Sequence, residues 1–414
     1  MTSNNNIPQG YKKTDLGIIP EDWYETKIGS LGNIVGGGTP NTLDPSFWNG
    51  HIQWYTPAEI GNCKYIKASM RTITEKGLNH SSAKILPKGT ILLTTRASIG
   101  QSAILKTQAA TNQGFQSIIV NNECSNEFVY YLLKTKVREM INVSSGSTFL
   151  EISKHKLSTI SVVIPPLAEQ KAIATALSDV DALIVALDKK IEKKKLIKQG
   201  AMQQLLTCKK RLPGFTEEWV ETTIGNISEL MKGSGLSKEK LSMSGKYKCI
   251  LYGEIFTTYN YVVEKCKSRT DSREGLKSEI GDVILPGSTT TKGIDLAKAV
   301  CIKENDILLG GDVIIIRNSR KEFCSDFLAI YLSEVNKETI AEKSQGTTII
   351  HLHAPQLAEV KICIPSSIKE QQAIATILSD MDKEISDLET KRDKYRQIKS
   401  GMMQKLLTGQ IRLK

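Results

Sequence analysis

Two segments of this chain carry apolar residues at alternating spacings of four and three positions, the pattern of a helix with a coiled-coil seam. The first seam consists of Ile173, Leu177, Val180, Ile184 and Leu187. The second consists of Ile374, Leu378, Met381, Ile385 and Leu388, each 201 positions (374 − 173) after its counterpart. We therefore expect two helices of about 40 residues, each about 60 Å long at the α-helical rise.

Outside these helices the pattern changes to short apolar runs separated by glycine and asparagine turns, which favours strands. In the first such segment the strand-like runs lie at residues 90–94, 117–120 and 160–164, and one helical stretch lies at residues 127–141. Residues 213–365 repeat this mixed pattern faintly, with Trp219 and Gly225 in the places of Trp23 and Gly29. The two helical segments are thus nearly the same in sequence, whereas the two mixed segments share a few landmark residues and differ in the sequence between them.

A domain-sized unit that occurs twice predicts an α+β fold with a pseudo-two-fold internal repeat. Two mixed α/β domains would be separated by two long coiled-coil helices, which a two-fold relation makes antiparallel with their seams facing. The expected segments are a first domain, a central helix, a second domain and a C-terminal helix, at residues 1–165, 166–210, 211–365 and 366–414. The pattern is typical of helices that do one job twice and domains that each recognise something different.

Composition narrows the class of protein. The 414 residues carry a net charge of +11, which fits a polyanionic partner such as nucleic acid and equally fits a protein that is merely basic. The eight cysteines are scattered without a C-x-x-C pair, which argues against a structural metal and fits a reducing cytoplasm. No apolar stretch is long enough for a membrane span, and the polar N-terminus has no signal-peptide pattern, so we expect a cytoplasmic protein.

Several motifs that suggest catalysis lack the residues that catalysis needs. The prolines Pro165 and Pro166 lack the Asn or Asp and the aromatic residue of an amino-methyltransferase motif, so we interpret them as a stiff strand-to-helix hinge. Residues 36–40 are glycine-rich without the Lys-Ser/Thr of a phosphate loop, and we interpret them as a turn, with close approach of DNA as the alternative. His351 and His353 share a strand face without an evident third ligand, which favours ordinary surface histidines.

The repeated segments resemble the specificity subunits of type I restriction-modification systems, and the resemblance covers nearly the whole chain. It rests on three paired features. The hinges, with Glu169-Gln170 and Glu370-Gln371, lie at residues 164–174 and 364–375. The helix ends lie at residues 198–206 and 399–407, and the domain openers lie at residues 19–23 and 212–219. One departure is an extra residue between Pro365 and the second Glu-Gln pair. The second hinge is therefore expected to set a slightly different angle.

This resemblance implies two target recognition domains, each of which reads one half of a bipartite site in double-stranded DNA. It implies that the helices set the spacer between the half-sites and dock two methyltransferase subunits, with translocase-nuclease subunits joining through the complex. It also implies a subunit with no catalytic site and no bound cofactor or metal, so that S-adenosylmethionine, ATP and Mg²⁺ are expected on the partner subunits.

Residue types that read bases gather in loop tips after the shared strand of both copies. Arg and Lys read guanine, Asn and Gln read adenine, and Ser and Thr contact either. The candidates are Thr95, Arg96, Ser98, Gln101, Asn112 and Gln113 in the first copy, and Ser288, Thr289, Thr290 and Lys292 in the second. The alternative for about half of them is an ordinary polar loop residue.

Basic residues near these loops are candidates for phosphate contacts, which position a protein on DNA without reading its sequence. They are Lys12, Arg71, Lys84, Lys238, Lys240, Lys246, Lys248, Arg269 and Arg273. The lysine run at residues 189–195 is interpreted as a solvated helix face, with contact to DNA along the helix as the alternative.

Two other functions compete with non-catalytic DNA recognition. One is the specificity module of a combined methyltransferase-nuclease with enzymatic activity, against which the missing catalytic motifs weigh. The other is a coiled-coil adaptor, which leaves the basic charge and the paired domains unexplained.

Overall fold

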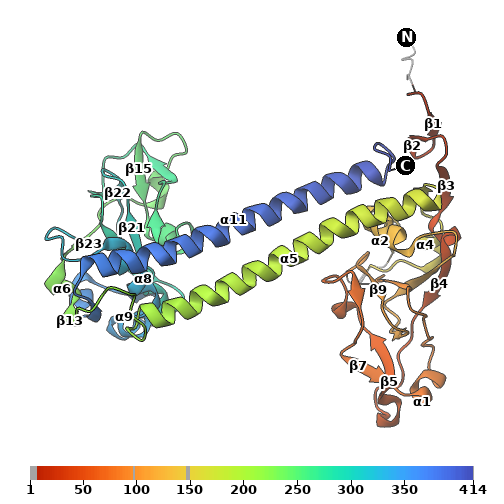
Figure 1. Ribbon diagram of the computed structural model, residues 1–414, viewed down its shortest axis with the longest axis horizontal. Coiled ribbons are helices and arrows are strands. Elements are labelled where there is room, and N and C mark those ends of the chain that lie inside the picture. Colours follow the sequence, from red (N-terminus) through yellow and green to blue (C-terminus); the bar gives the residue numbers. More distant parts are fainter. Residues whose placement is uncertain (1–6, 97, 146–149, 414) are drawn as a thin grey trace. The chain divides into compact units, whose positions relative to one another are not determined.

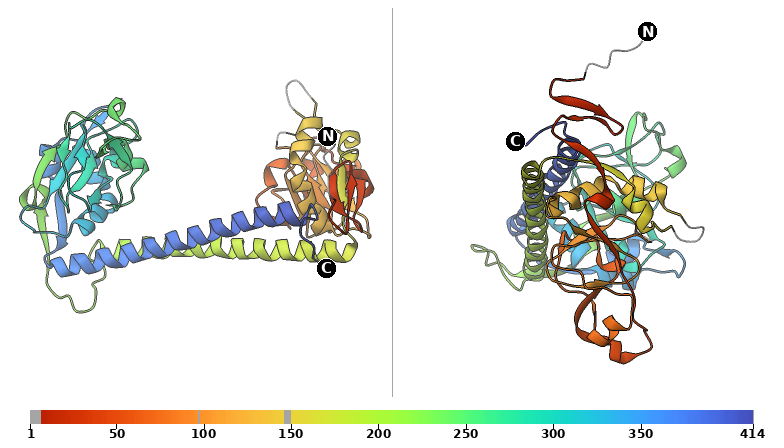
Figure 2. Two further views of the ribbon diagram at one scale, coloured as in Figure 1. Left: turned by 90° about the horizontal axis from the view of Figure 1, so that it is seen from above. Right: turned by 90° about the vertical axis from the view of Figure 1, so that its right-hand side faces the viewer.

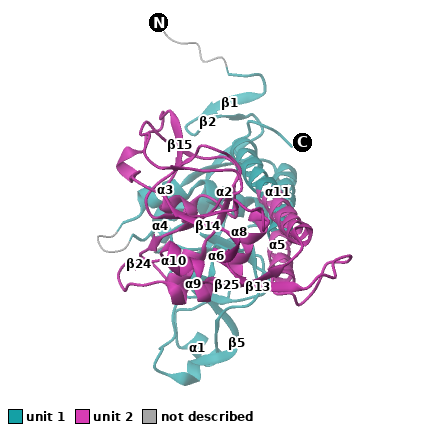
Figure 3. Cartoon of the chain, turned by 90° about the vertical axis from the view of Figure 1, so that its left-hand side faces the viewer, with its two compact units in different colours: residues 1–188, 390–414 teal, residues 189–389 magenta. Residues whose placement is uncertain are grey.

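The computed structural model describes residues 7–96, 98–145 and 150–413, and the chain divides into two compact units. The first unit comprises residues 1–188 and 390–414, and the second comprises residues 189–389 (Figure 3). Each unit contains one mixed domain and part of each of the two long helices.

The first unit is built on a five-stranded sheet with the strand order β4-β11-β8-β9-β6. Its strands are β4 (Gly32–Gly36), β6 (Tyr65–Ile66), β8 (Ile91–Leu93), β9 (Ser102–Leu105) and β11 (Gln116–Val120). Strands β6 and β9 are parallel, and the other pairs in this sheet are antiparallel. Strand β8 is apolar at every position and fully buried, as expected for an inner strand that is covered on both faces.

Smaller sheets and short helices complete the first unit (Figure 1). The remaining strands are β1 (Tyr11–Thr14) with β2 (Gly17–Pro20), β3 (Tyr24–Lys27) with β12 (Ser161–Ile164), and the sheet of β10 (Ala110–Thr111), β5 (Trp48–Tyr55) and β7 (Arg71–Ile73). The helices are η1 (Ile28–Ser30), η2 (Pro45–Phe47), η3 (Pro57–Glu59), α1 (Glu75–Asn79), α2 (Asn126–Thr135), α3 (Val137–Val143) and α4 (Lys154–Ser158).

The single helix expected over residues 127–141 is two helices, α2 and α3. At Lys136 the backbone leaves the helical region with φ −96° and ψ 3°. Its N–H bonds the carbonyl of Leu133, three residues back instead of four. The apolar pattern runs through this break, because both helices pack on the same core, and periodicity alone could not reveal it.

The second unit repeats this architecture. Its five-stranded sheet has the order β14-β23-β19-β21-β16, and its strands are β14 (Glu229–Lys232), β16 (Val262–Val263), β19 (Val283–Pro286), β21 (Val300–Ile302) and β23 (Val313–Arg317). The smaller sheets join β17 (Ser268–Thr270), β15 (Tyr247–Ile250), β22 (Leu308–Leu309) and β18 (Leu276–Lys277); β13 (Trp219–Thr223) and β25 (Lys361–Pro365); and β20 (Ser288–Thr289) and β24 (Ile350–His351). The helices are α6 (Ile224–Ile227), η4 (Lys238–Lys240), α7 (Tyr252–Thr257), η5 (Gly293–Ala297), α8 (Ser325–Glu334), α9 (Lys337–Lys343) and α10 (Ala354–Ala358).

The strand orders of the two large sheets correspond one to one, including the parallel pair at one edge, β6 with β9 and β16 with β21. The faint textual repeat between the mixed segments is therefore a repeat of the fold. The predicted fold class, with two mixed α/β domains and two long helices, is confirmed.

The long helices are α5 (Leu167–Leu205) and α11 (Ile368–Leu406). Within the first unit Asp181 contacts Lys399 at 2.5 Å and Asp188 contacts Arg396 at 3.3 Å, so the last turns of α11 run antiparallel beside the first part of α5 (Figure 2). Within the second unit Lys198 contacts Asp382 at 2.6 Å and Lys195 contacts Glu389 at 2.6 Å, again in antiparallel order.

The four pairs just named form a reciprocal set, because each pair in one unit returns in the other with its members displaced by 201 positions and their helices exchanged. In the lysine run, Lys194 and Lys195 pair with glutamates of α11, whereas Lys189, Lys190 and Lys193 are exposed.

The seam residues are placed as follows. Ile173, Leu177, Ile184, Leu187, Ile374, Leu378 and Ile385 are buried, and Val180, Met381 and Leu388 are half-buried. The first seam turns pack on more than the opposite helix: Ile173 and Leu177 join the core of the first domain, together with Leu406 and Leu407 from the end of α11. In the second unit Ile374 and Leu378 share a core with the end of α5. No helix among the described residues is long and apolar enough to cross a membrane.

Candidate nucleic-acid interface

In the first unit the loop after β8 meets the chain before α4, and this meeting point positions Arg96. The backbones of Arg96 and Glu151 form an isolated β-bridge. The guanidinium donates from Nε at 3.1 Å and from Nη2 at 2.5 Å to Oε2 of Glu151. Both side chains remain open to solvent, at 45% and 36% exposure. Arg96 is thus a cation held in one orientation at the surface.

The neighbouring candidate Thr95 is fully buried and supports the loop. Its N–H and its hydroxyl both donate to the carbonyl of Gly114, at 2.9 and 3.1 Å. Its own carbonyl accepts from the N–H of Ile152 at 3.1 Å. The side chain of Thr95 therefore fixes the position of Arg96 and presents no free hydroxyl at the surface.

Asn112 and Gln113 lie in the next loop, beside the glycine-rich segment. Asn112 accepts from the N–H of Gly114 at 2.9 Å, and the exposed Gln113 accepts from the hydroxyl of Thr39 at 2.5 Å. A Cβ added at Gly37 would lie 2.0 Å from the carbonyl oxygen of Asn112. The glycine there is required by close packing of protein backbone.

Ser98 and Gln101 belong to the same loop as Arg96, and the N–H of Ser98 donates to the carbonyl of Arg96 at 2.8 Å. Ser98 is half-buried and Gln101 is exposed. Lys12 donates to the carbonyl of Glu21 at 2.8 Å. Arg71 stacks its guanidinium 3.6 Å from the ring centroid of Trp48, and Lys84 is exposed.

The second unit presents different side chains on the same frame. Gly287 N–H donates to the carbonyl of Asp312, as Thr95 N–H donates to that of Gly114 in the first unit. Leu352 N–H donates to the carbonyl of Gly287, as Ile152 N–H donates to that of Thr95. Ser288 pairs with His351 between β20 and β24, where the first unit pairs Arg96 with Glu151. The hydroxyl of Ser288 lies 3.2 Å from Oδ2 of Asp312.

A cleft of about 550 Å³ opens at this point of the second unit, and it gathers several of the candidates. It is lined by Tyr252, Phe256, Ser288, Thr289, Thr290, Thr291, Asp295, Asp312, Ile349 and His351. Ser288 and Thr289 are buried in its wall, whereas Thr290 and Lys292 are exposed. The sequence-based candidates did not include Tyr252, Phe256 and Asp312. The prediction that His351 and His353 share a strand face is wrong, because β24 ends at His351 and His353 is the N-cap of α10.

The basic candidates of the second unit lie on the lobe around β15, and several are already engaged. Lys240 pairs with Glu274 at 2.5 Å, and Lys248 pairs with Glu304. Arg269 donates to the carbonyl of Gly245 at 2.8 Å and Arg273 donates to the hydroxyl of Tyr247 at 3.2 Å. Lys238 and Lys246 are exposed.

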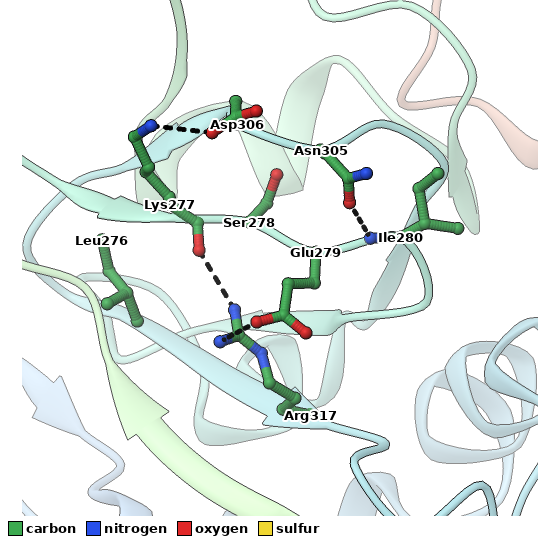
Figure 4. A pocket seen from close by; sticks show the side chains of 8 residues that line it. All are labelled: Leu276, Lys277, Ser278, Glu279, Ile280, Asn305, Asp306 and Arg317. Carbon is green, nitrogen blue, oxygen red and sulfur yellow. Dashed lines mark hydrogen bonds and ion pairs between the residues drawn. The ribbon is translucent and has the colours of Figure 1, made fainter.

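A second depression of the second unit, about 660 Å³, surrounds Arg317 (Figure 4). The guanidinium contacts Asp282 at 2.8 and 2.9 Å, Glu279 at 2.7 Å and the carbonyl of Lys277 at 3.0 Å. This arginine braces the β18–β19 connection to β23, because its donors are directed at protein acceptors.

Each hinge carries a buried glutamate that binds an arginine from beyond the end of the other helix. Glu169 accepts from Arg412 at 2.7 and 2.8 Å and from the indole N–H of Trp23 at 3.0 Å. Glu370 accepts from Arg211 at 2.7 Å through both of its oxygens. Burial acts to raise the pKa of Glu169, but the hydrogen bonds from Arg412 and Trp23 outweigh it and hold the pKa below its ordinary value.

The adjacent glutamines fasten the hinges in the same way in both units. Gln170 donates to the carbonyl of Pro165 at 3.0 Å, and Gln371 donates to that of Pro365 at 2.8 Å. The extra residue of the second hinge lies before α11, so Glu169 and Glu370 occupy the same position in their helices. Their arginine partners, Arg412 and Arg211, recur at the same 201-residue displacement, and this repeat is the signal in the sequence that indicates both pairs.

Comparison with known proteins now assigns the repeated units. Residues 20–198 and 216–399 match the family model of the type I restriction modification DNA specificity domain. The chain belongs to this family. Both matched segments contain a mixed domain and most of its long helix, so the family unit occurs twice.

Individual relatives in this family support the assignment. The chain is 45% identical over 178 residues to the type I restriction enzyme MjaIX specificity subunit of Methanocaldococcus jannaschii, an alignment that covers 42% of this chain and 41% of that relative. It is 24% identical over 417 residues to the MjaVIII specificity subunit of the same organism, covering 96% and 94%. The fold resembles the crystal structure of a type I restriction-modification S subunit from M. genitalium, with a TM-score of 0.60, 18% identity and 98% coverage of both chains.

Proposed function

We propose that this chain is the non-catalytic DNA-recognition subunit of a type I restriction-modification complex. Each mixed domain reads one half of a bipartite site in double-stranded DNA. The two long helices set the spacer between the half-sites and dock two methyltransferase subunits, with translocase-nuclease subunits joining through that complex. In this proposal S-adenosylmethionine, ATP and Mg²⁺ are bound by the partner subunits, and the complex acts in the cytoplasm.

The main support for the proposal is that the two units share the same backbone arrangement but carry different side chains at one equivalent position. The two large sheets have the same strand order, and the loop after the central strand is held by equivalent backbone hydrogen bonds in both units. At the bridge beside it the first unit holds Arg96 and Glu151, and the second holds Ser288 and His351. Two related domains that carry different polar side chains at one equivalent place are suited to two different half-sites.

The net charge of +11 supports a DNA partner, because each cation near a phosphate releases a counterion. The reciprocal ion pairs between α5 and α11 support the role of the helices. They repeat in both units with exchanged partners, so they fix the antiparallel register of a spacer.

Exchange of a whole domain tests the proposal. Residues 15–165 would be replaced by the first domain of a family member that has a known half-site, and the chain would be expressed with its methyltransferase partner. Single-molecule sequencing of methylated adenines should then reveal a bipartite motif in which only one half has changed. A simultaneous change in both halves, or a motif without two halves for the unmodified chain, would refute the proposal.

A further inference from the structure

We infer that Arg96 is a specificity-determining residue that reads a guanine in the first half-site, and that Glu151 positions it for this contact. The inference rests on the proposed function, since it assigns a base to one residue of the proposed interface. It depends on three features of the first unit: the edge of the guanidinium that Glu151 uses, the fixed backbone around Arg96, and the different side chains at the equivalent place in the second unit.

Glu151 engages one edge of the guanidinium and leaves another. The two contacts use Nε and Nη2, which lie on the same side of the planar group. The end-on edge, made of Nη1 and the second N–H of Nη2, is directed away from Glu151. That edge presents two parallel donors at the spacing of guanine O6 and N7, which is the commonest specific contact in the major groove.

The backbone that carries Arg96 is held by the hydrogen bonds of Thr95 and by the bridge to Glu151. The N–H and hydroxyl of Thr95 bind the carbonyl of Gly114, and the bridge to Glu151 follows at once. An exposed arginine ordinarily loses considerable side-chain freedom when it binds a base. Here the ion pair with Glu151 has already restricted that freedom, so less is lost on contact with DNA.

The second unit provides the contrast that a specificity residue requires. Its frame places Ser288 where the first unit has Arg96, and His351 where the first unit has Glu151. Ser288 is buried and its hydroxyl is directed to Asp312. A cation at this place therefore belongs to the first half-site alone, and a guanine read by Arg96 has no symmetric counterpart in the second half-site.

The test uses the complex of the full chain with its methyltransferase partner. Once the methylated motif of the unmodified complex is known, each guanine of the first half-site is replaced in turn by 7-deazaguanine, which keeps O6 and lacks N7. One such replacement should weaken binding of the unmodified complex and should weaken binding of the Arg96→Ala complex no further. Discrimination against the other base pairs at that position should fall about 5- to 140-fold in the variant.

Two further variants separate base reading from general charge. Arg96→Lys keeps the charge without the fork and should retain only part of the preference for guanine. Arg138→Ala removes an exposed arginine from α3 of the same unit and should leave the motif unchanged. Melting curves confirm that each variant is folded.

The outcomes are distinct. A motif relaxed at one guanine of the first half-site supports the inference. A fully specified motif in Arg96→Ala, relaxation in the second half-site, or an equal loss of binding to all sequences would overturn it and leave the proposed function standing. A wild-type complex without any bipartite motif would refute the proposed function itself.

Discussion

The buried pair of Glu169 and Arg412 offers a direct test of how the first unit is held together. Glu169 belongs to the start of α5, Arg412 follows the end of α11, and Trp23 belongs to the opener of the first domain. Substitution Glu169→Ala leaves the guanidinium without its bidentate acceptor and the indole N–H without its partner. Only 5% of the Glu169 side chain and 17% of that of Arg412 are exposed, so water replaces these contacts poorly.

Removal of one member of a buried ion pair costs about 3–5 kcal/mol. Arg412 is partly exposed and keeps its contact with Asp22 at 2.7 Å, so this case lies near the lower end, at about 3 kcal/mol. For a unit of about 200 residues each kcal/mol lowers the melting temperature by about 2–4 °C, so Glu169→Ala should lower it by about 6–12 °C. Calorimetry and urea titration measure both quantities. The exposed Glu21→Ala is the matched control and should change stability by less than about 0.5 kcal/mol.

A double-mutant cycle identifies the pair as the cause. Because Glu169→Ala and Arg412→Ala each break the same contact, the double variant should be more stable than the sum of the two single effects predicts, by at least about 1 kcal/mol. Additive effects, or a stability of Glu169→Ala equal to that of Glu21→Ala, would show that this contact does not fasten the ends of the helices to the domain.

Three further predictions follow from the helices and hinges. Leu177→Asp or Leu378→Asp places an unpaired charge in a domain core and should abolish the cooperative melting transition of its unit; unchanged melting curves would contradict the packing. Because the pKa of Glu169 is lowered in the folded chain, the contribution of Glu169 to the free energy of unfolding should be fully present above the ordinary pKa of 4.5 and should be lost as the pH falls below it. Acid should therefore destabilise Glu169→Gln less than the unmodified chain. Equal acid sensitivity of the two would exclude this carboxylate as the cause. Four residues inserted after both Leu187 and Leu388 lengthen each helix by about 6 Å, and methylated-adenine sequencing should reveal a spacer longer by one or two base pairs; an unchanged spacer would mean that the helices do not set it.

The fold could be predicted to a considerable extent because its main signals are local. A heptad seam depends only on spacing along one helix, and the two seams lie in the helices 167–205 and 368–406. The break at Lys136 was missed because α2 and α3 pack on one core and keep a continuous apolar pattern. Strand pairings were also beyond local reasoning, since they join residues as distant as β3 and β12.

The burial of the candidate side chains could not be predicted from the sequence, because the burial of a polar side chain depends on distant partners. Thr95 and Arg96 are adjacent in the same loop, yet one is buried against Gly114 and the other is exposed beside Glu151. Both are polar residues of one loop, so neither residue type nor position in the chain indicates which of the two is buried. The cleft residue Asp312 was missed for the same reason, since only the folded second unit brings it to Ser288.

The 201-residue repeat nevertheless distinguishes positions whose residue type is the same in both copies from positions whose residue type differs, and their contacts explain the difference. Asp181 and Lys198 return unchanged as Asp382 and Lys399, and each contacts the helix of the other copy. A substitution at any of these four positions breaks an ion pair that joins the two helices, so it disturbs the scaffold. Arg96 and Ser288 occupy equivalent places but contact only their own domains. They are free to differ without disturbing the helices. Under the proposed function, a chain of this design therefore changes the half-site that each domain reads while the pair of helices stays the same.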